Sequence, residues 1–172
     1  MNILIIGGAG YIGAHTVLEV LDAGNSVVVF DNFSTGQKKN IDSRAKIFKG
    51  DIRLKRDLET VFDKYIFDAV INFCALKAPE ESMTKPEIYS EVNIIGSLNI
   101  INTMLAHNVT KLIFSSSSSV YGDAITFPLR ENNKLEPKNI YGYTKMLNEE
   151  IAEYYSKQSV HVYLPLLTIL YS

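Results

Sequence analysis

The chain has 172 residues, of which 47% are hydrophobic, and its formal net charge at pH 7 is −2. This length suits one well-packed domain and is short for two. The composition is not that of a disordered chain, and no basic stripe indicates that it binds nucleic acid. No apolar stretch is long enough to span a bilayer, so no membrane partner is expected.

Cysteine and histidine usage also narrows the possible functions. The single cysteine, Cys74, cannot form an internal disulfide, which favours a reducing compartment and predicts a cytoplasmic protein. It follows an apolar segment, so we interpret it as a small buried residue rather than a nucleophile. His15, His107 and His161 share no ligand-like spacing and no cysteine cluster accompanies them, so no metal is expected.

A glycine-rich turn near the N-terminus carries the strongest functional signal. The apolar segment 3–6 is short enough for a buried strand, and it leads through Gly7, Gly10 and Gly13 into a helical pattern at 14–21. Glycines in such a turn let the main chain approach a pyrophosphate closely, and the helix N-terminus then offers unpaired N–H groups. Strand, glycine turn and helix in this order predict a dinucleotide-binding site.

The next apolar segment, residues 26–30, ends at Asp31 and Asn32. An acidic residue about twenty positions beyond the glycine turn is placed to bind a ribose 2′-hydroxyl. Because a carboxylate there would repel a 2′-phosphate, the sequence favours NAD over NADP as the cofactor.

Strand-like and helical segments alternate along almost the whole chain. Apolar segments this short, separated by helices, are typical of a parallel sheet covered on both faces. We therefore expect one doubly wound α/β domain of the Rossmann type over residues 1–172. The expected strands are 3–6, 26–30, 45–48, 69–73, 111–114 and 160–164, and the expected helices are 14–21, 54–65, 87–107 and 140–157.

Two further segments predict acid–base chemistry. Five serines, 115–119, follow the fifth strand at the sheet edge where ligands lie in open α/β folds. Tyr141 and Lys145 are four residues apart at the start of a helix and therefore share one face. We expect the lysine ammonium to lower the pKa of the phenol, so that Tyr141 can exchange a proton with a sugar or alcohol hydroxyl near neutral pH.

Taken together, these motifs resemble the extended short-chain dehydrogenase/reductase family, and within it the UDP-glucose 4-epimerases. The resemblance covers residues 1 to about 160. The segments that match, in the order the family has them, are Gly-Gly-Ala-Gly-Tyr-Ile-Gly at 7–13, Asp-Asn at 31–32, Gly-Asp-Ile-Arg at 50–53, Ala-Leu-Lys-Ala at 75–78, Ser-Ser-Ser-Ser-Ser-Val-Tyr-Gly at 115–122 and Tyr-Gly-Tyr-Thr-Lys at 141–145.

The resemblance implies a set of cofactor contacts, from the pyrophosphate at residues 11–12 to the adenine at 51–52, with residues 73–77 passing along the cofactor. It also implies the catalytic residues Ser117, Tyr141 and Lys145. The expected NAD-binding residues are Gly7, Gly10, Tyr11, Ile12, Gly13, Asp31, Asn32, Asp51, Ile52, Phe73, Cys74, Ala75, Lys77, Asn93 and Lys145.

The reaction implied by the resemblance is epimerisation at C4 of a UDP-sugar, UDP-glucose or UDP-galactose. Tyr141 would remove the 4-hydroxyl proton while hydride moves to NAD, and the 4-keto sugar would rotate and take the hydride back on its other face. Sugar-nucleotide 4,6-dehydratases typically carry Thr-Asp-Glu where this chain has serines at 117–119, which disfavours that reaction. A reductase of the same family remains open.

After the sixth strand the family continues into a further strand and a smaller domain that binds the UDP moiety, and we expect this chain to lack both. Two functions therefore stay open. One is a 4-epimerase of this family, and the other is a non-catalytic NAD-binding module or truncated product that acts by associating with another chain. Epimerases of the family commonly pair through two long helices, which correspond here to 87–107 and 140–157, so a homodimer is a further expectation.

Overall fold

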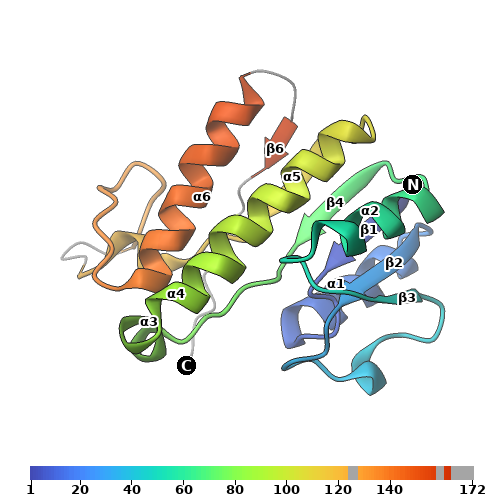
Figure 1. Ribbon diagram of the computed structural model, residues 1–172, viewed down its shortest axis with the longest axis horizontal. Coiled ribbons are helices and arrows are strands. Elements are labelled where there is room, and N and C mark those ends of the chain that lie inside the picture. Colours follow the sequence, from blue (N-terminus) through green and yellow to red (C-terminus); the bar gives the residue numbers. More distant parts are fainter. Residues whose placement is uncertain (124–127, 158–160, 164–172) are drawn as a thin grey trace.

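Six parallel strands form one sheet in the order β3-β2-β1-β4-β5-β6 (Figure 1). The computed structural model describes residues 1–123, 128–157 and 161–163. The strand order reverses direction between β1 and β4, which defines the doubly wound topology and confirms the predicted fold class. The strands are β1 (Asn2–Ile6), β2 (Ser26–Asp31), β3 (Lys46–Lys49), β4 (Ala69–Asn72), β5 (Lys111–Phe114) and β6 (His161–Tyr163).

The helices connect the strands in the predicted alternation. The long helical region expected at 87–107 is continuous but contains a π-helical turn in its first half. A short helix that the sequence pattern did not predict, α3, precedes it. The helices are α1 (Tyr11–Asp22), α2 (Lys55–Lys64), α3 (Pro79–Thr84), α4 (Pro86–Tyr89), the π-helical turn η2 (Ser90–Ile95), α5 (Gly96–Ala106) and α6 (Ile140–Ser156), with single 3-10 turns η1 (Lys38–Asn40) and η3 (Ser118–Tyr121).

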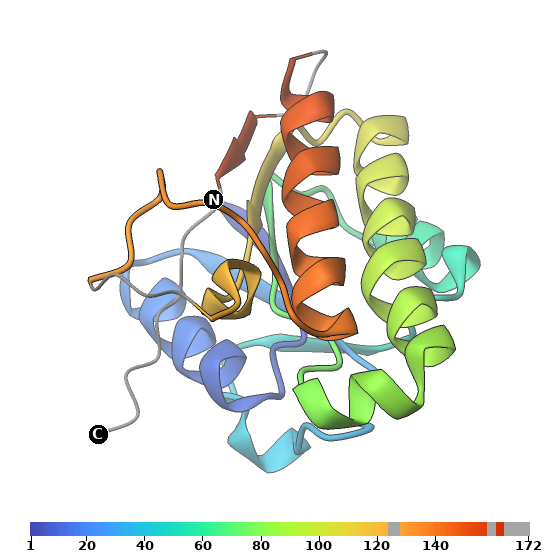
Figure 2. The same cartoon turned by 90° about the vertical axis from the view of Figure 1, so that its left-hand side faces the viewer.

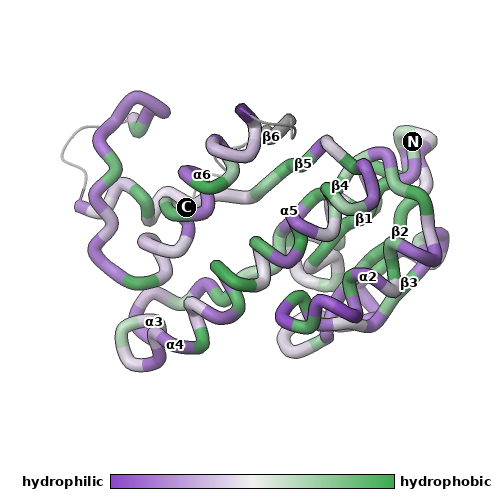
Figure 3. Tube along the Cα trace, turned by 45° about the horizontal axis from the view of Figure 1, so that its top comes forward, coloured by the Kyte–Doolittle hydropathy of each residue, from purple (hydrophilic) through white to green (hydrophobic). Residues whose placement is uncertain are grey.

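Alternating side chains of the strands build two apolar layers, one on each face of the sheet. On one face Leu4 and Ile6 of β1 pack against Leu58 of α2 and Met104 of α5. On the other face Ile3 and Ile5 belong to the cluster that includes residues of α1. Figure 2 shows the sheet between α1 on one side and α5 and α6 on the other. Because both faces of the central strands are covered, these strands are mostly apolar, with polar residues at their ends (Figure 3).

Parallel pairing places the carboxyl ends of the strands at one edge of the sheet. β1 pairs with β2 on one side and with β4 on the other, and β4 pairs in turn with β5. The turns that follow these four strands therefore lie next to one another, on both sides of the point where the strand order reverses. This edge is where open α/β sheets bind ligands.

Within the described residues, no helix combines the length and the hydropathy needed to cross a membrane.

His107 joins α5 to α2 at the opposite end of the molecule from this edge. Its Nδ1 lies 2.9 Å from the carbonyl oxygen of Thr103, and its Nε2 lies 3.0 Å from a carboxylate oxygen of Asp63. Both partners are acceptors, which favours the doubly protonated imidazolium. The Asp63 carboxylate, followed by the Thr103 carbonyl, raises the pKa of His107 above its ordinary value. A cation at the C-terminus of α5 also interacts favourably with the helix dipole.

Replacing His107 with Gln should therefore destabilise the fold in a pH-dependent way. Because the pKa of the folded state is raised, the stabilisation is fully present below the unfolded value of about 6.5 and is lost as the pH rises through the folded value. Solvent exposure limits the effect to roughly 0.5 kcal/mol. Urea unfolding at about pH 5.5 and about pH 8.5 measures it, with Asp63→Asn as the matched variant. Equal destabilisation by His107→Gln at both pH values would contradict this account.

Candidate functional site

The glycine turn joins β1 to α1 by direct backbone packing. A Cβ atom added at Gly13 would lie 2.3 Å from the carbonyl oxygen of Gly7, and one added at Gly7 would lie 2.8 Å from the amide nitrogen of Cys74. Gly7 also has a φ of +77°, which L side chains rarely adopt. The two glycines therefore let β1, α1 and the segment after β4 meet without any side chain between them.

The N-terminus of α1 carries N–H groups that no side chain caps. The helix begins after Gly10, and its first internal bond runs from the Ala14 N–H to the Gly10 carbonyl. The N–H groups of the first turn have no acceptor within the helix. A Cβ at Gly10 would have only one neighbour, the Gly7 carbonyl oxygen at 3.4 Å, so the space in front of these N–H groups is open. Open space and unpaired donors at a helix N-terminus fit a pyrophosphate.

Asp31 ends β2 beside this turn and is held by two backbone donors. The N–H of Ala9 donates to one carboxylate oxygen at 2.9 Å, and the N–H of Phe33 donates to the other at 2.8 Å. Asp31 is only 9% exposed. Each oxygen keeps a free lone pair, so the carboxylate can still accept hydrogen bonds from ribose hydroxyls. The structure therefore places Asp31 next to the glycine turn, as expected.

Asn32 and Asp51 lie together after β2 and β3. The Asn32 side-chain amide donates to Asp51 at 3.1 Å, and Arg53 donates to both oxygens of Asp51 from its Nε and Nη2. The Arg53 guanidinium holds the pKa of the Asp51 carboxyl at about 2, although burial opposes this. Ile52, which the resemblance placed at the adenine, is 3% exposed and packs within the core between α2 and α5. The sequence analysis did not single out Arg53.

Asn93 ties the segment after β4 to α6. Its side-chain oxygen accepts a hydrogen bond from the N–H of Leu76, and its amide nitrogen donates to the Leu76 carbonyl and to the hydroxyl of Thr144. Thr144 in turn donates to the carbonyl oxygen of Tyr141. Asn93 is fully buried, so the structure gives its carboxamide a positioning function for residues 73–77.

Phe73, Cys74 and Ala75 are partly buried along this segment, whereas Lys77 is exposed. Burial raises the pKa of the Cys74 thiol to about 12, with Asp31 and Asp51 adding to the effect. A thiol with this pKa is not a nucleophile near neutral pH. The raised pKa agrees with the interpretation of Cys74 as a small residue that is not a nucleophile.

Ser117, Tyr141 and Lys145 come together at the carboxyl end of β5. The Lys145 ammonium donates to the carbonyl oxygen of Ser115 at 2.7 Å. The Ser117 hydroxyl lies close enough to the Tyr141 phenol to act on its pKa. The first turn of α6 packs directly on η3, because a Cβ at Gly142 would lie 2.6 Å from the Ser119 carbonyl oxygen. This close backbone approach brings the tyrosine on α6 to the serine that precedes η3.

The structure corrects one expectation about this group, since the pKa of Tyr141 is raised rather than lowered. Burial of the phenol is the larger cause, and the hydrogen bond with Ser117 opposes it. Lys145 does not lower the pKa, because its ammonium is directed to the Ser115 carbonyl and lies 4.6 Å from the centre of the Phe114 ring. The spacing of four residues placed both side chains on one face but did not determine where the ammonium points.

Lys145 itself has a perturbed pKa. Its side chain is almost completely buried, and burial lowers the pKa from its ordinary value to about 8, while Cys74 and Glu149 act in the opposite direction. A lysine with a pKa this close to neutrality can exchange a proton under physiological conditions. Such groups are typical of functional sites.

The helix that the sequence analysis missed, α3, also positions Tyr141. The hydroxyl of Ser82 accepts a hydrogen bond from the Tyr141 N–H at 3.1 Å and donates to the carbonyl of Pro79. Ser82 is completely buried. The first turn of α6 is thus capped from outside by α3 as well as by the Asn139 side chain, which accepts from Gly142. The sequence signal that could have revealed α3 is Ser82 three residues after Pro79.

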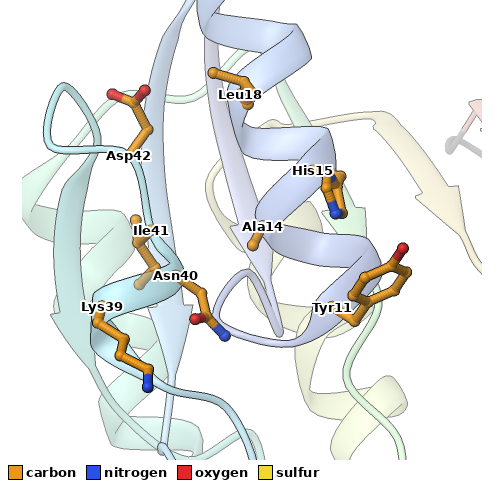
Figure 4. Close-up of a pocket in the computed structure, with 8 residues that line it drawn as sticks. All are labelled: Tyr11, Ala14, His15, Leu18, Lys39, Asn40, Ile41 and Asp42. Atoms are coloured by element: carbon orange, nitrogen blue, oxygen red, sulfur yellow. The ribbon is translucent and has the colours of Figure 1, made fainter.

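A separate pocket of about 460 Å³ opens between α1 and η1 (Figure 4). The candidate catalytic residues Ser117, Tyr141 and Lys145 do not line it, so we do not assign it to the reaction. Its lining residues are Tyr11, Ala14, His15, Leu18, Lys39, Asn40, Ile41 and Asp42.

A parallel sheet with a glycine turn at its switch point is typical of dinucleotide-binding proteins. Here a partly buried serine and a buried tyrosine and lysine lie beside that turn. The chain belongs to the NAD dependent epimerase/dehydratase family, whose model matches residues 3–171. The resemblance stated from the sequence is thereby confirmed.

Individual relatives are UDP-sugar epimerases. A bifunctional UDP-glucose 4-epimerase and UDP-xylose 4-epimerase of Pisum sativum is 41% identical over 162 residues, which are 88% of this chain and 46% of the relative. The chain therefore spans about half the length of the curated relatives that it matches.

Solved structures agree with this assignment. A UDP-glucose 4-epimerase of Thermus thermophilus in complex with NAD has a TM-score of 0.92 at 29% identity, covering 95% of this chain and 54% of that one. A Thermotoga maritima UDP-glucose 4-epimerase with UDP-glucose has a TM-score of 0.91 at 30% identity, with the same shares covered.

Proposed function

We propose that this chain carries the NAD-binding and acid–base half of a UDP-glucose 4-epimerase. The observation that carries the proposal is that Ser117, Tyr141 and Lys145 meet at the same sheet edge as the glycine turn and Asp31. The family match and the relatives crystallised with NAD and with UDP-glucose support it. The chain has a single cysteine, which cannot form an internal disulfide. This favours a reducing compartment and supports a cytoplasmic location.

The residues of the chain fit NAD in three places. The open N-terminus of α1 would hold the pyrophosphate through main-chain N–H groups, with Tyr11 and Ile12 in the first turn. Asp31 would accept hydrogen bonds from the adenosine ribose, with Asn32 beside it, and Asp51 would border the adenine. The segment 73–77, fixed by Asn93, would pass along the cofactor, and Lys145 would reach the nicotinamide ribose.

The chemistry supplied by bound NAD is reversible acceptance of a hydride from a carbon that bears a hydroxyl. Tyr141 would take the proton of the sugar 4-hydroxyl through its phenolic oxygen and later return it. Ser117 would contact both the Tyr141 phenol and the sugar hydroxyl. Tyr141 accepts this proton only as phenolate, and burial raises the pKa of the phenol. Lys145 would therefore have to place its positive charge close to Tyr141 to stabilise the phenolate.

A non-catalytic NAD-binding module is the second candidate. It is favoured by two observations of the acid–base group: the pKa of Tyr141 is raised by burial, and the Lys145 ammonium is directed to the Ser115 carbonyl. Both candidates require a functional NAD site, and only the first requires turnover. Cofactor binding and turnover must therefore be measured separately.

The first prediction concerns NAD. The purified chain should carry NAD that can be released, and the NAD-free protein should bind it in a calorimetric titration. Asp31→Asn should weaken binding about tenfold, because one hydroxyl would lose a charged acceptor. It should also reduce the preference for NAD over NADP, because the charge that repels a 2′-phosphate is gone.

Glu19→Gln removes a carboxylate from the exposed side of α1 and should leave the NAD affinity unchanged. An unchanged affinity in Asp31→Asn would remove Asp31 from the ribose site. A folded chain that binds no NAD at all would overturn the proposal for both candidates.

The second prediction concerns turnover. Tyr141→Phe removes the proton-transfer atom and should lower the interconversion of UDP-galactose and UDP-glucose at least about 100-fold. The NAD affinity should change by no more than about twofold, because the ring and its packing remain.

Tyr143→Phe is the matched control, since Tyr143 lies on the same helix but is 57% exposed. It should leave both turnover and NAD affinity unchanged. Full turnover in Tyr141→Phe would show that another group moves the proton. A parent chain that binds NAD without any interconversion would favour the non-catalytic module.

We also propose that two copies associate through α4, η2, α5 and α6. Ile88 and Ile95 are seven residues apart on the continuous helical run, and both expose apolar surface, as does Tyr154 on α6. α6 lies beside this run in Figures 1 and 2 and contacts η2 and α4. Exposed apolar side chains on adjacent helices are typical of a subunit interface.

Sedimentation analysis tests the association. The chain should sediment as a dimer, and Ile95→Glu should convert it to a monomer, because a charge would be buried without a partner. Ile66→Glu, at an equally apolar but remote exposed position in the loop before β4, should leave the dimer intact. A monomeric parent chain would contradict the proposal.

A further inference from the structure

Glu149 lies on the catalytic face of α6 but has no function in the reaction described above. Tyr141, Lys145 and Glu149 follow one another at intervals of four residues and therefore stack along one side of the helix. Glu149 is partly buried, whereas its neighbour Glu150 is exposed. A carboxylate that is withdrawn from water requires a partner.

Ser116 is that partner. Its side chain is 5% exposed, and its hydroxyl donates to a carboxylate oxygen of Glu149. Ser116 stands between two residues of the site, because the carbonyl of Ser115 accepts from Lys145 and the Ser117 hydroxyl acts on the pKa of Tyr141. Fixing Ser116 therefore fixes the backbone that presents both of these contacts.

The charges around Lys145 are few. Glu149 lies one turn further along α6, and Glu149 and Cys74 are the groups whose charge would act on it. The end of β5 contributes the Phe114 ring, and the next residue contributes the neutral Ser115 carbonyl. Burial raises the pKa of the Cys74 thiol to about 12, so Cys74 stays neutral near pH 7. Glu149 is thus the acidic group in the described structure whose charge acts on the Lys145 ammonium.

We propose that Glu149 is a positioning residue that Ser116 tethers beside Lys145, where its carboxylate keeps the ammonium charged and the end of β5 in register with α6. The inference rests on the proposed function, in which a charged Lys145 close to Tyr141 would stabilise the phenolate. The electrostatic link between Glu149 and Lys145 is a property of the protein alone and can be measured without cofactor or substrate.

The measurement is an NMR titration of Lys145 in NAD-free protein labelled at the lysine side chains, from about pH 6 to about pH 11. The Lys145→Met variant assigns the signal. Glu149→Gln keeps the size of the side chain but removes its charge, so the Lys145 midpoint should move to lower pH. Ser116→Ala keeps both charges and should move the midpoint in the same direction by less, because the freed carboxylate would turn to solvent.

Glu150→Gln and Ser118→Ala are the matched controls, since each makes the same chemical change at an exposed neighbouring position. Both should leave the Lys145 midpoint in place. An unshifted midpoint in Glu149→Gln would overturn the electrostatic link, and an unshifted midpoint in Ser116→Ala would overturn the tether. If Glu149→Gln does not fold, Ser116→Ala decides the proposal, because it removes only one hydroxyl.

These outcomes are distinct from failure of the proposed function. A chain that binds no NAD would still report the Lys145 midpoint, so the coupling would stand while the epimerase assignment fell. In the same NAD-free titration, Glu149→Asp keeps the charge. The Lys145 midpoint of this variant should therefore lie close to that of the parent chain. If the Lys145 midpoint in Glu149→Asp is as low as in Glu149→Gln, the charge of Glu149 is not what sets it, and the function of Glu149 is purely structural.

Discussion

Backbone packs directly on backbone where β1, α1 and the segment after β4 meet. The Gly7 carbonyl lies where a Cβ of Gly13 would be, and Gly7 itself touches the main chain at Cys74. No side chain fits between these elements, so their relative positions are set by hard contacts and do not depend on rotamers. The open N-terminus of α1, the carboxylate of Asp31 and the path of residues 73–77 are all defined by this contact.

A second constraint, the buried ammonium of Lys145, organises the other half of the site. Withdrawing a charge from water is unfavourable unless donors and acceptors compensate for it. Here a main-chain carbonyl, an aromatic face and the carboxylate of Glu149 provide that compensation, and they come from β5 and α6. The two elements must therefore dock in one register, and this register also brings Tyr141 to Ser117.

The order of strands and helices could be predicted because the pattern of apolar residues repeats with the period of each element. The strands at 26–30 and 69–73 were correct to within about one residue, since buried parallel strands are continuously apolar. The short helix α3 was missed because six residues carry too little periodicity. The contact of Ser82 with Tyr141 could not be predicted for a different reason, because it joins residues 59 positions apart in the sequence.

Among the site residues too, local signals were found from the sequence and contacts between side chains were not. The glycine spacing and Asp31 are local signals, and the structure places them together as expected. The pKa shift of Tyr141 was predicted with the wrong sign, because burial raises it and no effect of Lys145 opposes this. Spacing along a helix says which side chains share a face and nothing about which partner an ammonium selects. Glu149 and Arg53 were missed because a single charged residue on a helix or in a loop is ordinarily solvated.

The two halves of the site depend on different parts of the chain, and this separates cofactor binding from catalysis. The turn after β1, the ends of β2 and β3 and the segment after β4 hold the groups that fit NAD. The end of β5 and the first turns of α6 hold the acid–base group. All of them lie within a chain that spans about half of its relatives. A change that prevents proton transfer at Tyr141 would therefore lower turnover while leaving the groups that fit NAD assembled.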